Sequence, residues 1–146
     1  MRTLAAVLWL LLWAAAPAFA AGDTNEFTLC EHQGRRQAYE WRVSEARILA
    51  TPEWTMGATN IPLSPDKAWQ VAKNWFLKHD YGQPEFARME IRPFALSDSP
   101  HKSWRRRFFY RIECIPMQFD SMLVIVLLDG TVLEPKRIPW QPGEIK

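Results

Sequence analysis

The segment Met122–Leu128 (MLVIVLL) constrains the fold of this chain more than any other segment. Successive residues of a strand point to opposite faces of a sheet, so this run is apolar on both faces, as a central strand would be. Antiparallel sheets commonly leave one face to water. Here both faces need cover from elsewhere in the chain, one carrying Val124, Val126 and Leu128 and the other Leu123, Ile125 and Leu127.

A helix predicted from Pro65 to about Tyr81 supplies one of these covers. Ser64 suits the N-cap, Pro65 suits the first helical position, and Gly82 suits the C-cap. The apolar side chains recur at helical spacing and form one stripe: Ala68, Val71, Ala72, Trp75, Phe76 and His79. We expect this stripe to pack on one face of the sheet.

A first strand is predicted to begin at Gln37. Its apolar residues change parity near Ser44–Glu45, because one set precedes this point (Tyr39, Trp41 and Val43) and another follows it (Ala46, Ile48 and Ala50). A β-bulge near Ser44–Glu45 would join the two halves into one strand.

The remaining strands follow the helix. Residues 87–92 and 104–115 alternate between apolar and polar side chains, and residues 131–138 form the last strand. Asp129-Gly130 is a hairpin signal between this last strand and Met122–Leu128. The last strand contains Pro135 and Lys136, which predict a position at an exposed sheet edge.

The order strand, helix and then four strands predicts an α+β domain, with one helix packed on an antiparallel sheet of four to five strands. This domain spans residues 37–138. Residues 21–36 are polar and are expected to form a loosely ordered N-terminal segment, and residues 139–146 an irregular tail.

Residues 1–20 have the three parts of a cleavable export signal. Arg2 provides the positive start, Leu4–Ala16 is uninterruptedly apolar, and Ala18-Phe19-Ala20 places small residues at the −3 and −1 positions. The run is shorter than the roughly 20 apolar residues of a membrane-spanning helix. We therefore expect cleavage between Ala20 and Ala21, a secreted or periplasmic product, and membrane contact only through the signal peptide before cleavage.

The charge of the mature part is close to balanced. Cleavage removes Arg2 from the 18 basic residues of the chain, which leaves them nearly equal to the 16 acidic residues. Such a balance gives no reason to expect nucleic acid as a partner. The six tryptophans that follow the signal can supply a packed core, so no cofactor is expected.

Two cysteines, Cys30 and Cys114, lie in the mature part. Export to an oxidising compartment would permit a disulfide between them. Two buried thiols that never meet are an equally good interpretation, because the sequence does not show whether the two Cα atoms approach. Cys30 and His32 have the wrong spacing for a structural zinc motif, so no metal site is expected.

No catalytic motif is visible. The chain lacks a Gly-x-Ser-x-Gly elbow, a catalytic-cysteine signature and paired carboxylates. We therefore expect a binding or inhibitory module, not an enzyme, acting on a protein partner in the periplasm or envelope. The alternative is an envelope enzyme whose site is assembled from scattered residues.

Basic and aromatic residues alternate over residues 102–111, which include Arg105, Arg107, Phe109 and Arg111. Such a strand could bind a polyanion or a lipid headgroup. The simpler interpretation, which we favour, is a solvated strand face whose arginines pair with Glu90 and Glu113.

The strip Leu123, Ile125 and Leu127 would be a second interaction surface if nothing in the monomer covers it. Together with Arg105, Arg107, Phe109 and Arg111, it would then bind a protein partner or a second copy of the chain. Cover within the monomer is the preferred expectation. It could come from the N-terminal segment with Phe27 and Leu29, or from the loop with Trp54 and Met56.

Three segments carry a family resemblance: SPDKAWQVAKNWF in the predicted helix, FFYRIECIP in a middle strand, and VIVLLDGTVLEPKRI in the closing hairpin. One helix followed by an antiparallel meander resembles the cystatin-like architecture and the small exported PepSY-like domains of bacteria. The resemblance implies a helix on an antiparallel sheet. The Gln-x-Val-x-Gly loop with which cystatins block proteases is absent from the chain.

The predicted export signal has a direct test. Mass spectrometry of the exported protein should give an N-terminus at Ala21, because the small residues that precede it suit signal peptidase. Membrane-bound material that retains Met1 would contradict cleavage.

Overall fold

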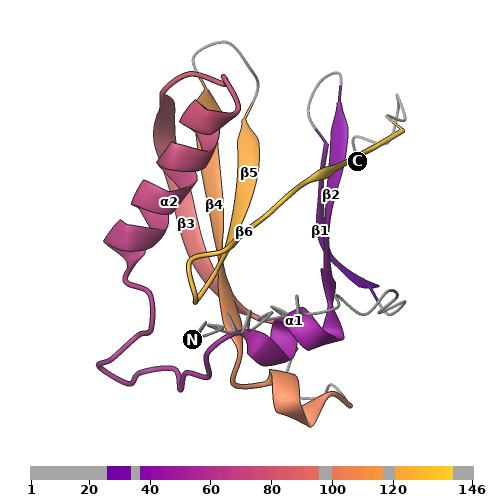
Figure 1. Ribbon diagram of the computed structural model, residues 1–146, viewed down its shortest axis with the longest axis vertical. Coiled ribbons are helices and arrows are strands. Elements are labelled where there is room, and N and C mark those ends of the chain that lie inside the picture. The colour runs from indigo at the N-terminus through magenta and orange to yellow at the C-terminus, as the bar shows by residue number, and fades with distance from the viewer. Residues whose placement is uncertain (1–25, 34–36, 96–99, 117–120, 140–146) are drawn as a thin grey trace, which may run out of the picture.

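The computed structural model describes residues 26–33, 37–95, 100–116 and 121–139 (Figure 1). These residues form two antiparallel sheets, one with strand order β1-β2-β7 and one with strand order β3-β4-β5-β6. Helix α2 covers the side of the four-stranded sheet that faces away from β1 and β2 (Figure 1). The α+β class is therefore confirmed, but two sheets stand where the sequence predicted one.

Strand β5 (Met122–Leu127) is the predicted central strand, and every one of its residues is buried. It pairs with β4 (Phe108–Pro116) on one side and with β6 (Val132–Leu133) on the other. Strand β3 (Pro84–Pro93) completes the sheet beside β4. The β5–β6 hairpin turns at Gly130, which has a φ of 86° and an N–H that donates to the Leu127 carbonyl oxygen at 2.9 Å.

Helix α2 (Pro65–Lys78) begins where the sequence predicts it. Ser64 caps the helix, with its hydroxyl oxygen accepting from the Lys67 N–H at 3.4 Å. The helix ends at Lys78, earlier than expected, because Asp80 already adopts a left-handed φ of 57°. The predicted stripe faces the sheet: Ala68, Ala72, Trp75 and Phe76 are buried against one face of β4 and β5.

The second sheet covers the other face of β5. It consists of β1 (Glu26–Gln33), β2 (Ala38–Ser44) and β7 (Lys136–Ile138). Its Trp41 packs in one core cluster with Phe109 and with the β5 side chains Leu123, Ile125 and Leu127. Leu29 packs against the same cluster, so the N-terminal segment does supply the cover within the monomer.

Four segments differ from the sequence expectation in their secondary structure. Residues 26–33, expected to be loosely ordered, form β1 because they pair along β2. Residues after Ser44 form helix α1 (Glu45–Ala50), not a bulged strand, because the Ser44 hydroxyl accepts from the Arg47 N–H at 3.2 Å and caps a helix. The parity change in the sequence therefore marks a turn from strand to helix.

The third difference is the predicted strand 104–115. Its first residue, Trp104, belongs instead to a short 3-10 helix, η1 (Lys102–Trp104), and β4 begins at Phe108. Trp104 is buried beside Val43 and Ile48, with its ring 4.6 Å from that of Phe27. The bulk of this tryptophan thus fills the base of the molecule, where α1 and η1 meet.

The predicted last strand, 131–138, is divided at Glu134-Pro135. Strand β6 pairs with β5 in the four-stranded sheet, whereas β7 pairs with β2 in the other sheet (Figure 1). Pro135 has no N–H to continue the first pairing. Lys136 is exposed on the edge strand β7, as expected. Pro139 has no regular structure, and the rest of the predicted tail lies outside the described residues.

A charge placed beneath α2 tests this packing. Ala72 is fully buried, so Ala72→Asp should lower the unfolding free energy by about 3 kcal/mol or more, because the carboxylate would be desolvated without a partner. Asn74→Asp, on the exposed side of the same helix, should change it by less than about 0.5 kcal/mol. Urea denaturation measures both, and equal stability of the two variants would contradict the placement of α2.

Candidate functional site

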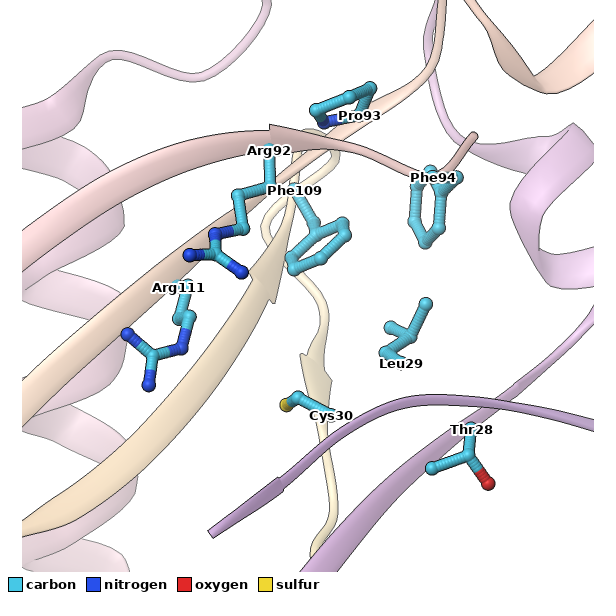
Figure 2. A pocket seen from close by; sticks show the side chains of 8 residues that line it. All are labelled: Thr28, Leu29, Cys30, Arg92, Pro93, Phe94, Phe109 and Arg111. Carbon is cyan, nitrogen blue, oxygen red and sulfur yellow. The ribbon is translucent and has the colours of Figure 1, made fainter. Parts of the chain in front are cut away.

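A cleft of about 440 Å³ opens between the two sheets, where β1 faces β3 and β4 (Figure 2). Its lining comes from β1 (Thr28–Cys30), from the end of β3 and the residue after it (Arg92–Phe94), and from β4 (Phe109 and Arg111). This volume falls in the range of about 300 to 1,000 Å³ that is usual for ligand sites.

A β-bulge in β1 shapes one wall of the cleft. The register between β1 and β2 shifts between Thr28 and Cys30, so that Thr28 pairs with Arg42 and Cys30 with Trp41. In a regular strand Leu29 and Cys30 would point to opposite faces. The bulge instead lets both side chains pack against the core between the sheets.

The apolar floor consists of two aromatic rings beside Leu29. Phe94 and Phe109 lie with ring centroids 5.0 Å apart and planes tilted by 48°. Phe109 is buried in the core, and the Phe94 backbone is held by its N–H, which donates to the Arg107 carbonyl oxygen at 3.0 Å. Both rings are therefore held in place by the four-stranded sheet.

The side chains of Arg92 and Arg111 gather at the other end of the cleft (Figure 2). Both contact the carboxylate of Glu90. Arg92 binds Glu90 Oε2 closely, through Nε at 2.9 Å and Nη2 at 2.8 Å. Arg88, which does not line the cleft, pairs with Glu90 Oε1. Arg111 lies farther away, with Nη1 at 3.8 Å from Glu90 Oε2. Three cations thus compete for one anion.

Arg111 is the least satisfied of these cations. Its side chain is only 22% exposed, and 3.8 Å is too long for a hydrogen bond to Glu90. Within the described residues its guanidinium group has no hydrogen bond. A guanidinium carries five N–H donors, so Arg111 presents unused donors at the cleft.

The thiol of Cys30 lines the cleft on its β1 side, across from Phe109 and Arg111 (Figure 2). Burial raises the pKa of the Cys30 thiol, while the charges of Arg111 and Arg92 act in the opposite direction. The net effect is upward, which disfavours the thiolate, the nucleophilic form of cysteine.

The four-stranded sheet separates the two cysteines. Cys114 packs among the residues beneath α2, whereas Cys30 packs on the opposite side of the same sheet. Both are free thiols, so the disulfide considered from the sequence is not formed. Burial raises the pKa of the Cys114 thiol to about 12.

The basic-aromatic segment does not form one surface. Arg107 turns inward, with a hydrogen bond to the Thr51 carbonyl oxygen and an ion pair to Glu53 at 3.3 Å. Phe109 belongs to the core, Arg105 follows η1 and is exposed, and Arg111 reaches the cleft. The expected pairing with Glu90 is present for Arg111.

The predicted apolar strip is interior. Leu123, Ile125 and Leu127 are at most 1% exposed, because β2 and the bulged part of β1 cover them. They do not form the outer interaction surface that the sequence left open. Of the residues proposed for such a surface, Phe109 and Arg111 line the cleft.

The histidines are engaged with neighbouring groups. His32 Nε2 lies 2.7 Å from the Ser121 carbonyl oxygen, which ties β1 to the start of β5. His79 Nδ1 lies 2.8 Å from the Trp75 carbonyl oxygen, and its Nε2 lies 3.7 Å from Glu134 Oε2. Across the described part of the chain, no group of three or more His, Cys, Asp or Glu residues is arranged to hold a metal ion.

Most cleft residues were missed in the sequence. Thr28 and Leu29 lie in a strand that was not predicted, and Arg92 to Phe94 lie at the end of one whose polar face was expected to be solvated. In β1 the apolar residues Phe27 and Leu29 alternate with polar ones, and Cys30 breaks this alternation. This pattern could have indicated a strand with a bulge.

Comparisons with protein-family models, curated proteins and solved structures find no match to this chain. The cystatin-like and PepSY-like resemblance therefore stays a prediction. The export signal, residues 1–20, lies outside the described residues. Among the helices that the structure does describe, none has the length and apolar character needed to cross a membrane.

The thiols provide a test of this arrangement. Because both pKa values are raised, native protein at pH 8 should react slowly with iodoacetamide, and fully buried Cys114 more slowly than half-buried Cys30. Unfolding in urea without reductant should make both react fast, as followed by mass spectrometry. A linked Cys30–Cys114 peptide in the unreduced digest would contradict the structure.

Proposed function

We propose that the mature domain is an exported binding module, and that its cleft takes a segment of a protein partner in the periplasm or cell envelope. The observation that carries this proposal is Arg111, whose side chain is 22% exposed and whose guanidinium group presents donors without a protein acceptor beside an apolar floor. A guanidinium group without a protein acceptor can form charge-assisted hydrogen bonds to an incoming carboxylate.

The chemistry of the cleft supports binding more than catalysis. Its ionisable groups are the guanidinium groups of Arg92 and Arg111 and the Cys30 thiol, whose raised pKa disfavours the nucleophilic form. Guanidinium groups hold and orient acceptors but do not shuttle protons near neutral pH. The alternative of an envelope enzyme has no comparable observation in its favour.

Strand β3, at one edge of the cleft, favours contact with a partner through side chains. Strand β3 is the outer strand of its sheet, and it carries Pro84, Pro93 and a row of charges. Prolines and charges protect such an edge from pairing with another strand. At the β3 edge, a partner segment would therefore bind mainly through its side chains.

The polyanion alternative loses its support, since Arg105, Arg107 and Arg111 lie in three different surroundings. We retain as a proposal the cystatin-like and PepSY-like relationship, which concerns α2 and the β3–β4–β5 meander. A binding or inhibitory role agrees with that relationship, although shared architecture alone does not assign a function.

Site-specific photo-cross-linking tests the proposal in the source cells. A photoreactive amino acid at Thr28, an exposed residue of the cleft wall, should give a discrete adduct with a partner protein. The same amino acid at Gln70, on the exposed side of α2, is the matched control and should not. Combining the Thr28 probe with Arg111→Gln should lower the adduct yield about tenfold.

The contrary result is equally defined. Equal adduct patterns from Thr28 and Gln70, or a Thr28 adduct that Arg111→Gln leaves unchanged, would contradict a binding role for the cleft. Circular dichroism of each variant serves to show that its fold is retained.

A further inference from the structure

The cleft has a charged end and an apolar end, and the two strands of the four-stranded sheet that line it repeat this order. On β4, Arg111 and Phe109 are two residues apart, and on β3 and its extension so are Arg92 and Phe94. Residues two apart in a strand share a face and are separated by about 7 Å. On each of these strands the arginine therefore lies two residues from the phenylalanine, and both arginines lie at the same end of the cleft (Figure 2).

The charged end has an excess of positive charge. The side chains of Arg88, Arg92 and Arg111 all contact the carboxylate of Glu90. The next acidic residue in the register of β3 and β4 is Glu113, which pairs with Arg88. Glu90 is already held by Arg92 at 2.8 to 2.9 Å, which leaves Arg111 with the longest contact. A ligand carboxylate would give Arg111 the bidentate partner that it lacks.

The apolar end is formed by Phe94, Phe109 and Leu29, directly beside the arginines. An aliphatic or aromatic side chain placed there would bury apolar area mainly against Phe94 and Leu29, because Phe109 is only 4% exposed. The recognised ligand must therefore present a carboxylate and an apolar group on one side, at a residue spacing close to the roughly 7 Å that separates the backbone positions of Arg111 and Phe109.

We infer that the cleft recognises an extended segment of the partner protein in which an Asp or Glu lies two residues from an apolar side chain. This inference rests on the proposed function. In an extended segment, residues i and i+2 point to the same side at this spacing, whereas adjacent residues point to opposite sides. A neighbouring acidic and apolar pair cannot reach both ends of the cleft together.

A peptide array tests the spacing. Blocked nonapeptides of Ser and Gly carry one Glu and one Leu, placed one to four positions apart, and are probed with the fluorescently labelled mature protein. Binding should be strongest at a separation of two. Replacing Glu by Gln in that peptide should weaken binding about tenfold, because the charge-assisted bond to Arg111 is lost.

Matched protein variants assign the effect to the cleft. Arg111→Gln should remove the difference between the Glu and Gln peptides. Arg88→Gln should keep it, because Arg88 also pairs with Glu90 but does not line the cleft. Thermal unfolding of both variants checks that neither has lost its fold.

Binding that is independent of spacing, a Gln peptide that binds as well as the Glu peptide, or an array that binds nothing would each overturn the inference. The cross-linking experiment then separates the two proposals. If the array fails while the Thr28 adduct still depends on Arg111, the binding role holds and the recognised motif is wrong. If both fail, the binding role itself is wrong.

Discussion

The rest of the structure depends on the burial of β5 on both faces. Its alternating side chains enter two separate cores, with Val124 and Val126 beneath α2 and Leu123, Ile125 and Leu127 beneath β1 and β2. One helix covers one face of a sheet, so a second layer has to come from elsewhere in the chain. The hairpin of β1 and β2 supplies it, and the resulting order of layers is helix, sheet, sheet.

The cleft is a consequence of where this second layer ends. On the face of the four-stranded sheet opposite α2, the β5 side chains are apolar, whereas their β4 neighbours Arg111 and Glu113 are charged. Sheet β1-β2-β7 covers the apolar half, and Ile115, farther along β4, is 47% exposed. The β-bulge at Leu29 lies at the edge of the area that this sheet covers. It places an apolar side chain in the cleft, which Arg92 and Arg111 also line.

Local signals predicted the parts of the fold that local interactions determine. The Ser64 cap, the Pro65 start and the stripe of α2 are set within one helix, and the β5–β6 turn is set by Asp129-Gly130. Pairing over long sequence separations gave no such signal. The sequence indicated neither that β7 pairs with β2 nor that the chain changes sheets at Pro135. The cleft joins Leu29 to Arg92, so its residues could not be grouped before the sheets were placed.

The division of the last strand between two sheets has a consequence during synthesis. Strand β2 lies between β1, its immediate predecessor, and β7, whose Ile138 pairs with Ala38. The ribosome releases the β1–β2 hairpin long before β5, and an isolated two-stranded hairpin is at best marginally stable in water. Trp41 therefore stays exposed to solvent until residues 122–138 emerge. Until the final strands are made, the apolar face of the β1–β2 hairpin lacks its partner layer, and truncation at Pro135 should leave an aggregation-prone product.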